Sequence, residues 1–490
     1  MGEWRGFAVD LGASNGRTVL GRYDGDKLEM QEVTRFLNIP VSLNGTMHWN
    51  FLGLYQEVLM GLAKVCASGK YPSTVGVDSW AVDFGLLDRH GELMGNPRHY
   101  RDHHNDGMVQ EVLDRVSAEK VYALTGIQTM QINTIYQLMY LKLYRQELLE
   151  RAQNMLLIPD LMTYFLTGVQ ASEFTNVTTT QLFNPLSGTW SLELISLLGL
   201  PERLFGPIVR PLEILGMIRD GVLGTGHYQK IKVVTVGEHD TASAVFAIPH
   251  EAGDYAYISS GTWSLVGIVS PKPIICEETR RHNFTNEGGV NGDYRVLKNV
   301  MGLWLWQEVK RQLDQKGEPK SFADLVQMAE RAKPLQAVID PDDPVFLAPE
   351  NMITAVQTYC QRTGQSPLVE LGDICRVILE SLALKYRWVI ETLEEITGRS
   401  LSVIHIIGGG VYNKALCQWT ADATNRLVLA GPAEATVIGN LSAQLISVGE
   451  LAGITDVPAL VRRSCETKQY EPKLDRAIWD EGYTNLLKLL

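Results

Sequence analysis

The sequence lacks the features that mark several common classes of protein. No apolar run approaches the roughly 20 residues that span a membrane, and the phosphate-binding pattern GxxxxGK[ST] is absent. The six cysteines, at positions 66, 276, 360, 375, 417 and 465, form no CxxC pair. A membrane span, a Walker-type nucleotide site, a zinc ribbon and a dithiol redox motif are therefore excluded. We expect buried free thiols, with Cys360 and Cys375 as the pair whose proximity is of interest.

The balance of charge excludes further partners. The 490 residues carry a formal net charge of −12, which argues against a nucleic-acid or anionic-membrane surface. The first residues, Met1-Gly-Glu-Trp-Arg-Gly6, lead directly into an apolar run and leave no room for a signal peptide. We therefore expect a cytoplasmic protein that binds small molecules. Length and the 45% hydrophobic content predict two or three domains.

Short apolar runs alternate with helical patterns along the chain. Strands are predicted at 75–84, around a turn, and at 231–236 and 404–407, and helices at 138–149 and from Thr241 and Asn413 onward. This alternation predicts an α/β fold. The most favourable domain break lies at 248–253.

A tight turn near the N-terminus has the composition of a phosphate site. Asp10-Leu-Gly-Ala-Ser-Asn-Gly-Arg17 follows an apolar run and precedes another, which predicts strand, turn, strand. Glycine leaves backbone N–H groups open to an anion, and Arg17 suits a phosphate. Asp10 could hold Mg²⁺ beside such phosphates, directly or through water. An ordinary hairpin with an exposed aspartate fits this segment equally well.

A second segment repeats this pattern half a chain later. Tyr255-Ala-Tyr-Ile-Ser-Ser-Gly-Thr-Trp-Ser-Leu265 has an alternating strand, a small-residue turn and a second apolar run. Two such turns suggest two related halves that face each other across a nucleotide.

Asp240 is the candidate general base. It lies in Glu238-His-Asp-Thr-Ala-Ser-Ala-Val245, between a predicted strand and a predicted helix. The helix dipole is expected to keep the carboxylate ionised and able to accept a hydroxyl proton. Flanking His239 and Thr241 could hold a polyol. A plain N-cap aspartate is the alternative interpretation.

Other polar or flexible positions give weaker signals. Gly408-Gly-Gly410 could let backbone approach a flat ligand, although such runs are usually tight turns. Asn299 and Gln307 bracket an apolar stretch and are candidate ligand contacts. His99, His103 and His104 favour a solvated loop or the rim of a substrate site over a zinc site, because adjacent histidines point apart.

Taken together, these motifs resemble the FGGY carbohydrate kinases of the actin/hexokinase/Hsp70 ATPase superfamily. The resemblance extends over nearly the whole chain, from about Phe7 to about Gly449. Besides the segments above, the similar stretches are Asn286-Glu-Gly-Gly, Tyr294-Arg-Val-Leu-Lys-Asn-Val-Met-Gly-Leu-Trp and Gly431-Pro-Ala-Glu-Ala-Thr-Val-Ile-Gly-Asn. The resemblance implies two ribonuclease-H-like domains, at 1–248 and 249–490, with the active site in the cleft between them.

The resemblance also implies an activity. It implies ATP, Mg²⁺ and L-rhamnulose as reactants, with L-rhamnulose 1-phosphate and ADP as products, and a monomer or small homo-oligomer. Asp240 matches the family's base, and Asp10 remains the candidate for the metal. The positions that match ATP contacts are Ala13, Ser14, Asn15, Gly16, Arg17, Thr262, Gln307 and Gly409, and those that match sugar contacts are Ala81, His239, Asp240, Thr241 and Asn299.

One position departs from the family pattern, and two alternatives remain. Glycine is expected after Trp80, where this chain has Ala81. The extra methyl group narrows the pocket and leaves open another ketose, such as L-fuculose. A non-catalytic, actin-like ATP-binding regulatory protein is the alternative from a different class.

Overall fold

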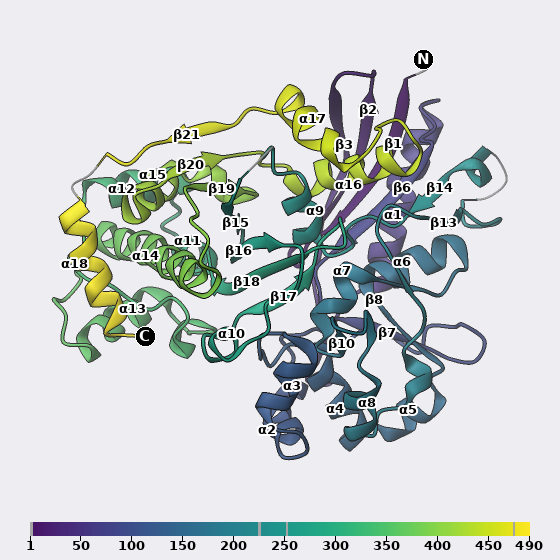
Figure 1. Ribbon diagram of the computed structural model, residues 1–490, viewed down its shortest axis with the longest axis horizontal. Helices are drawn as coiled ribbons and strands as arrows, with labels where there is room; N and C mark the ends of the chain where they lie inside the picture. Colours follow the sequence, from purple (N-terminus) through teal and green to yellow (C-terminus); the bar gives the residue numbers. More distant parts are fainter. Residues whose placement is uncertain (1–2, 224–226, 251–252, 474–475) are drawn as a thin grey trace. The chain divides into compact units, whose positions relative to one another are not determined.

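The computed structural model describes residues 3–223, 227–250, 253–473 and 476–490, and Figure 1 traces the chain. These residues group into two compact units. The first comprises Met1–Glu251, Val269–Val296 and Ala435–Ser464, and the second Ala252–Ile268, Leu297–Glu434 and Cys465–Leu490. Residues 251–252, in the segment predicted to contain the domain break, lie outside the described residues. Among the described residues, no helix is long and apolar enough to cross a membrane.

A six-stranded sheet forms the centre of the first unit. Strand β1 pairs antiparallel with β2 and parallel with β6, and β6 pairs parallel with β14. In order across the sheet, the strands are β13 (Ile214–Met217), β14 (Lys232–Val234), β6 (Thr74–Ser79), β1 (Trp4–Leu11), β2 (Asn15–Tyr23) and β3 (Leu28–Leu37).

Helices cover both faces of this sheet. Phe7, Val9 and Leu11 point to one face and share a core with α1 (Phe51–Ala67) and α6 (Ile158–Thr167). Because side chains alternate along a strand, Ala8 and Asp10 point to the other face. There α16 (Ala435–Ser447) packs on β1 and β6 and also on α9 (Asp240–Phe246).

Glycines at two positions of the sheet let α16 approach it closely. A Cβ at Gly21 would lie 2.6 Å from the Leu441 side chain, and one at Gly76 would lie 2.6 Å from Oδ1 of Asn440. A methyl group at either position would force these side chains to shift, so glycine allows the close approach.

A second core within the first unit joins a small sheet to a group of helices. Strand β7 (Phe84–Leu87) pairs antiparallel with β8 (Asn154–Leu157). Further helices and strands of this unit are α2 (Met108–Leu113), α3 (Ala118–Thr125), α4 (Thr134–Tyr144), α5 (Gln146–Arg151), α7 (Phe174–Val177), α8 (Leu192–Leu197), α10 (Glu277–Arg281), α17 (Val457–Ser464) and β17 (Thr285–Gly288).

The second sheet has seven strands, most of them in the second unit. Its longest neighbouring helix, α14 (Leu371–Thr397), is buried along most of its length and packs against α15 and α12. The strand order is β17, β18 (Tyr294–Met301), β16 (Trp263–Ser270), β15 (Tyr255–Ser260), β19 (Val403–Ile407), β20 (Leu427–Ala430) and β21 (Lys468–Tyr470). The helices of the second unit are α11 (Trp304–Gln315), α12 (Phe322–Arg331), α13 (Met352–Arg362), α14, α15 (Lys414–Thr424) and α18 (Arg476–Leu487).

The two sheets share a topology around their hairpins. In the first, β1 pairs antiparallel with β2 and parallel with β6, which pairs parallel with β14. In the second, β15 pairs antiparallel with β16 and parallel with β19, which pairs parallel with β20. Both predicted turns therefore join the first two strands of equivalent arrangements, as the repeated pattern in the sequence suggested.

Several predictions of local structure need correction. The helix predicted at 138–149 is two helices, α4 and α5, because Arg145 leaves the helical region with φ −142° and ψ 43°. The strand predicted at 231–236 is shorter, at Lys232–Val234. All six cysteines are free, as expected; Cys66, Cys360, Cys375 and Cys417 are buried, but Cys276 and Cys465 are only partly buried, so the expectation of burial is wrong for these two.

Candidate active site

The first turn joins β1 to β2 and exposes the side chains of Ser14 and Asn15. The N–H of Gly12 donates to the carbonyl of Asn15 at 2.9 Å, which closes the turn. Nε of Arg17 donates to Oδ2 of Asp10 at 2.8 Å, and both side chains are largely buried. The turn thus places a carboxylate and a guanidinium side by side, so the predicted metal ligand and the predicted phosphate contact are paired with each other.

The second turn joins β15 to β16, and it brings two predicted nucleotide contacts together. Thr262 Oγ1 donates to Gln307 Oε1 at 3.3 Å. The N–H groups of Leu303 and Trp304 donate to the carbonyls of Gly261 and Thr262 at 3.1 and 3.0 Å. The start of α11, which carries Gln307, is therefore fixed to the turn.

The triple glycine lies against this second turn, and its three members differ. A Cβ on Gly410 would overlap the Ser260 side chain, and one on Gly408 would lie 3.1 Å from the Ser260 carbonyl. A Cβ on Gly409 would meet nothing within 4 Å. Packing against Ser260 therefore explains Gly410, and a φ of +79° together with this packing explains Gly408, whereas the space beside Gly409 is open.

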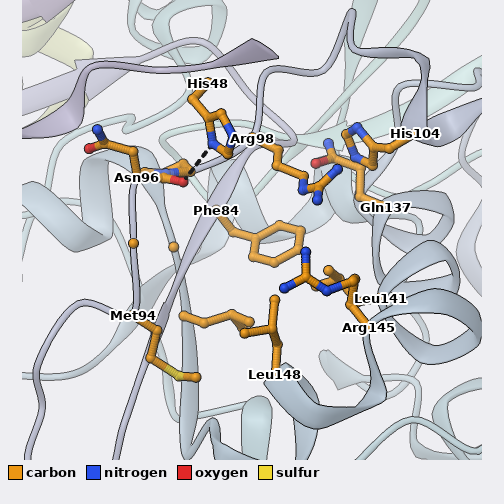
Figure 2. Close-up of a pocket in the computed structure, with 14 residues that line it drawn as sticks. His48, Phe84, Met94, Asn96, Arg98, His104, Gln137, Leu141, Arg145 and Leu148 are labelled. Carbon is orange, nitrogen blue, oxygen red and sulfur yellow. Dashed lines mark hydrogen bonds between the residues drawn. The ribbon is translucent and has the colours of Figure 1, made fainter. Parts of the chain in front are cut away.

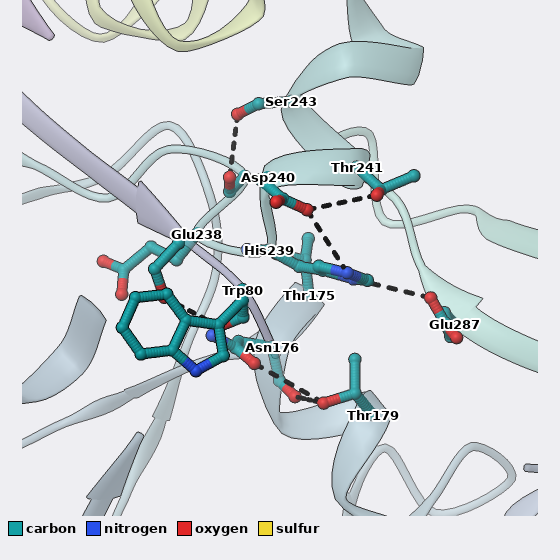
Figure 3. Close-up of polar contacts among 12 residues, drawn as sticks. Trp80, Thr175, Asn176, Thr179, Glu238, His239, Asp240, Thr241, Ser243 and Glu287 are labelled. Atoms are coloured by element: carbon teal, nitrogen blue, oxygen red, sulfur yellow. Dashed lines mark hydrogen bonds and ion pairs between the residues drawn. The ribbon is translucent and has the colours of Figure 1, made fainter. Parts of the chain in front are cut away.

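Asp240 is the first residue of α9, not its N-cap, which is His239. Oδ1 of Asp240 accepts from the Thr241 hydroxyl at 3.1 Å (Figure 3). Burial, and after it the nearby carboxylate of Asp10, raise the pKa of Asp240 to about 7, although the hydrogen bonds from Thr241 and the charge of Arg295 act in the opposite direction. The expectation of a carboxylate held ionised by the helix is therefore wrong near pH 7, where protonated and ionised forms coexist.

The backbone before Asp240 is held by the neighbouring strand and helix. The N–H of Ser79 donates to the carbonyl of Glu238 at 2.9 Å, and the N–H of His239 donates to Oγ1 of Thr175 at 3.1 Å. Glu173 fixes this helical turn, because its carboxylate accepts from the N–H groups of Thr175 and Glu238. The position of Asp240 thus depends on residues far away in the sequence.

Ala81 lies beside a strained and densely bonded segment that sequence reasoning missed. Val82 has φ +68°, a conformation that β-branched residues rarely adopt. Asp83 is fully buried, and its carboxylate accepts from Nε1 of Trp49 at 2.5 Å and from Nε1 of Trp80 at 3.1 Å. Strain of this kind is typical of functional sites. A charged residue inside the apolar run Val82-Asp-Phe-Gly-Leu-Leu87 was the available signal.

Two carboxyl groups lie on neighbouring strands where a metal was expected. Asp10 on β1 pairs in parallel register with Asp78 on β6. Asp78 is fully buried, and its Oδ2 accepts from Asn440 at 2.6 Å while Oδ1 has no hydrogen-bond partner. Burial and Asp10 raise the pKa of Asp78 well above its usual range. In the described ranges, no group of three or more His, Cys, Asp or Glu residues forms a metal cluster.

A cavity of about 230 Å³ lies in the first unit. His104, a candidate for the rim of a substrate site, lines it, whereas none of the predicted base, sugar, ATP or metal positions does. Figure 2 shows Phe84 at its centre, with Arg98 and Gln137 above and Leu148 below. Gln137, which lines the cavity, also donates to Oδ1 of the buried Asp83 at 2.8 Å. The cavity lining is therefore hydrogen-bonded to the carboxylate that accepts from Trp49 and Trp80.

The three histidines of the predicted loop behave differently. His103 is exposed, whereas His104 is buried with Nδ1 2.8 Å from Oδ1 of Asp102, and His99 stacks on Trp49 with ring centroids 4.0 Å apart. A solvated loop is therefore wrong for His99 and His104.

The two units hold different parts of the predicted set. Ala13–Arg17, Ala81 and His239–Thr241 lie in the first unit, and Thr262, Gln307 and Gly409 in the second. Asn299, a predicted sugar contact on β18, also lies in the second unit.

Comparison with known proteins identifies the family. The N-terminal domain of the FGGY family of carbohydrate kinases matches residues 6–247, and the C-terminal domain matches residues 256–448. The chain belongs to the FGGY family of carbohydrate kinases. Two relatives named rhamnulokinase, from Bacteroides thetaiotaomicron and Bacillus subtilis, are both 40% identical to it. The alignments cover 97% of both chains for the first and 96% of both for the second.

Solved structures of sugar kinases share the fold at low identity. A gluconate kinase from Lactobacillus acidophilus has a TM-score of 0.83 at 16% identity, over 100% of this chain and 98% of that one. A glycerol kinase from Plasmodium falciparum, solved with ADP, has a TM-score of 0.79 at 15% identity, over 99% and 97%. The two-domain α/β fold implied by the resemblance is confirmed.

Proposed function

We propose that this carbohydrate kinase transfers the γ-phosphoryl group of ATP to the 1-hydroxyl of L-rhamnulose. The products are L-rhamnulose 1-phosphate and ADP, and the reaction belongs to L-rhamnose catabolism. The observation that carries the proposal is the 40% identity to curated rhamnulokinases over nearly the full length of both chains.

Asp240 acts as the general base in the first unit. Its carboxylate accepts the proton of the sugar hydroxyl as that oxygen bonds to the γ-phosphorus and the bond to ADP breaks. A pKa of about 7 suits this role, because a base works best when its pKa lies near the working pH. Ala81, His239 and Thr241 contact the sugar, together with Asn299.

Two sets of residues bind ATP. In the first unit, Ala13 to Arg17 offer backbone N–H groups and a guanidinium to the phosphates. In the second, Thr262 and Gln307 are already hydrogen-bonded to each other, and Gly409 leaves open space. We assign the first set to an N-terminal domain, 1–248, and the second to a C-terminal domain, 249–490.

The carboxyl groups of the first unit fit Mg²⁺. Mg²⁺ in kinases keeps several waters and uses only one or two carboxylates besides the phosphates, so no larger cluster is needed. Asp10 would hold the ion, directly or through water, and the unpartnered Oδ1 of the neighbouring Asp78 fits the same role. When bound, the ion neutralises phosphate charge. We also propose a cytoplasmic location, and a monomer or small homo-oligomer.

A second ketose remains the alternative substrate because of Ala81. Its side chain is partly exposed beside the strained Val82, and its methyl group occupies space that glycine would leave open. L-Fuculose, which differs from L-rhamnulose in the orientation of hydroxyl groups, is the ketose to compare.

An ADP-release assay over a panel of acceptors tests the proposal. We would measure kcat/KM for L-rhamnulose, L-fuculose, L-ribulose, D-xylulose and glycerol, and subtract the rate of an Asp240→Asn preparation as the background. L-Rhamnulose should give the highest value. A tenfold higher value for another acceptor would reject the substrate, and no phosphorylation of any acceptor despite ATP binding would favour a regulatory ATP-binding protein.

A further inference from the structure

A buried ion pair lies behind the histidine next to the proposed base. Nη2 of Arg295 lies 3.0 Å from Nδ1 of His239 and 3.2 Å from Oε2 of Glu287. The side chains of Arg295, Glu287 and His239 are each at most 8% exposed. On the opposite side of the imidazole, Nε2 of His239 lies 3.6 Å from Oδ1 of Asp240 (Figure 3). All four residues belong to the first unit.

The contact with Arg295 determines which imidazole nitrogen carries the proton. A guanidinium has only donors, so the nitrogen that faces it at 3.0 Å must accept. Glu287 would favour the opposite arrangement, with a proton on Nδ1, but its Oε2 lies farther away, at 3.4 Å. Because the Arg295 donor is the nearer of the two groups, Nδ1 is unprotonated and Nε2 carries the proton.

The electrostatic surroundings keep this imidazole neutral. Burial lowers the pKa of His239 well below its usual range, and the charge of Arg295 lowers it further. A neutral imidazole has a single N–H, so the choice made at Nδ1 also decides what Nε2 can do.

We propose that Arg295 and Glu287 form a positioning pair that fixes His239 as its Nε2–H tautomer, which presents a hydrogen-bond donor beside Asp240. At 3.6 Å this donor is too far from Asp240 for a hydrogen bond between them. It is therefore available to an oxygen of the substrate. The substrate class is one with oxygens on adjacent carbons, of which one gives its proton to Asp240 and the other accepts from His239. Only this last step rests on the proposed function.

Nitrogen-15 spectra of the imidazole rings test the tautomer without any activity measurement. The signal of His239, one of ten histidines, is assigned by its loss in His239→Gln. Wild type should show the proton on Nε2. In Arg295→Met, no guanidinium competes for Nδ1, so the Glu287 carboxylate, whose Oε2 lies 3.4 Å from it, should draw the proton to Nδ1.

Two further variants make this test specific. In Arg295→Met/Glu287→Gln, the new amide can donate to Nδ1, so the proton should return to Nε2. Arg295→Lys keeps a donor-only cation and should keep the wild-type tautomer. The matched control is Arg280→Met, which removes an arginine that pairs with Glu277 on exposed α10 and should change nothing. A proton on Nδ1 in wild type, or on Nε2 in Arg295→Met, would overturn the proposal. The wild-type spectrum decides this even if a variant fails to fold.

Steady-state kinetics test the contact with the substrate. Arg295→Met should raise the KM for the sugar by roughly 5- to 100-fold, because the sugar oxygen then meets an acceptor, and should leave the KM for ATP nearly unchanged. The double variant should recover part of the loss. Equal effects on both KM values would contradict the sugar contact. Failure of every acceptor in the panel would reject the proposed function and leave the tautomer result intact.

Discussion

Replacement of Asp240 by asparagine should abolish turnover and at the same time stabilise the protein at alkaline pH. The amide is similar in size to the carboxyl group, but it cannot accept the sugar's proton. The loss of a general base typically lowers the rate ~10²–10⁴-fold, so we expect a fall in kcat of that order.

The stability effect follows from the environment of the carboxyl group. Its pKa is raised from 3.8 to about 7, and a shift of this size corresponds to about 4 kcal/mol. Because the side chain is 31% exposed, solvent screens the charge, and we expect about 1–2 kcal/mol instead.

Proton binding determines whether the stability that Asp240 contributes rises or falls with pH. Between about pH 4 and pH 7 the folded carboxyl group holds its proton and the unfolded one does not. The contribution of Asp240 to stability is therefore full below this window and lost as the pH rises through it. Asparagine does not titrate, so the stability of Asp240→Asn relative to wild type should increase as the pH rises.

Thermal unfolding at pH 5 and pH 8, with EDTA and without nucleotide, measures this gain. We expect the difference in Tm between variant and wild type to be roughly 1–3 °C larger at pH 8, because a unit of this size unfolds with a large entropy change. Asp114→Asn, at an exposed position, is the control and should show no such change. More than half of wild-type activity, or an equal Tm difference at both pH values, would refute the reasoning.

Three further predictions concern the residues proposed to bind ATP and sugar, the choice between sugars, and the packing of α16 on α9. Thr262→Val should raise the KM for ATP, and His239→Ala the KM for the sugar; equal effects on both constants would argue against separate binding sets. Ala81→Gly removes one methyl group, worth about 0.8 kcal/mol, and restores the glycine of the family pattern, so the preference for L-rhamnulose over L-fuculose should rise by up to about fourfold; an unchanged kcat/KM ratio would exclude a contact. Gly439→Ala would place a Cβ on a main-chain carbonyl of α9, which should cost about 3 kcal/mol in unfolding experiments, whereas Gly453→Ala, in open space, should cost nothing comparable.

Local patterns in the sequence predicted the hairpins and the place of Asp240. Period-two alternation and small turn residues act over a few neighbouring residues, so the turns at Asp10–Arg17 and Ser259–Ser264 could be predicted without knowledge of the rest of the chain. The same reasoning placed Asp240 at the start of a helix after a strand. It could not separate the roles within Gly408–Gly410, because the neighbour that requires two of these glycines, Ser260, lies far away in the sequence.

Only the tertiary structure decided the charges and protons of the site. The pKa of Asp240 depends on burial and on Asp10, 230 positions earlier, and the sequence alone favoured an ionised carboxylate. The proton of His239 depends on Arg295, 56 positions away. Composition and periodicity determine which segments form strands, turns and helices, because these preferences are local. Protonation in a buried site depends on which charged groups the fold brings within a few ångströms, and no local pattern records that distance.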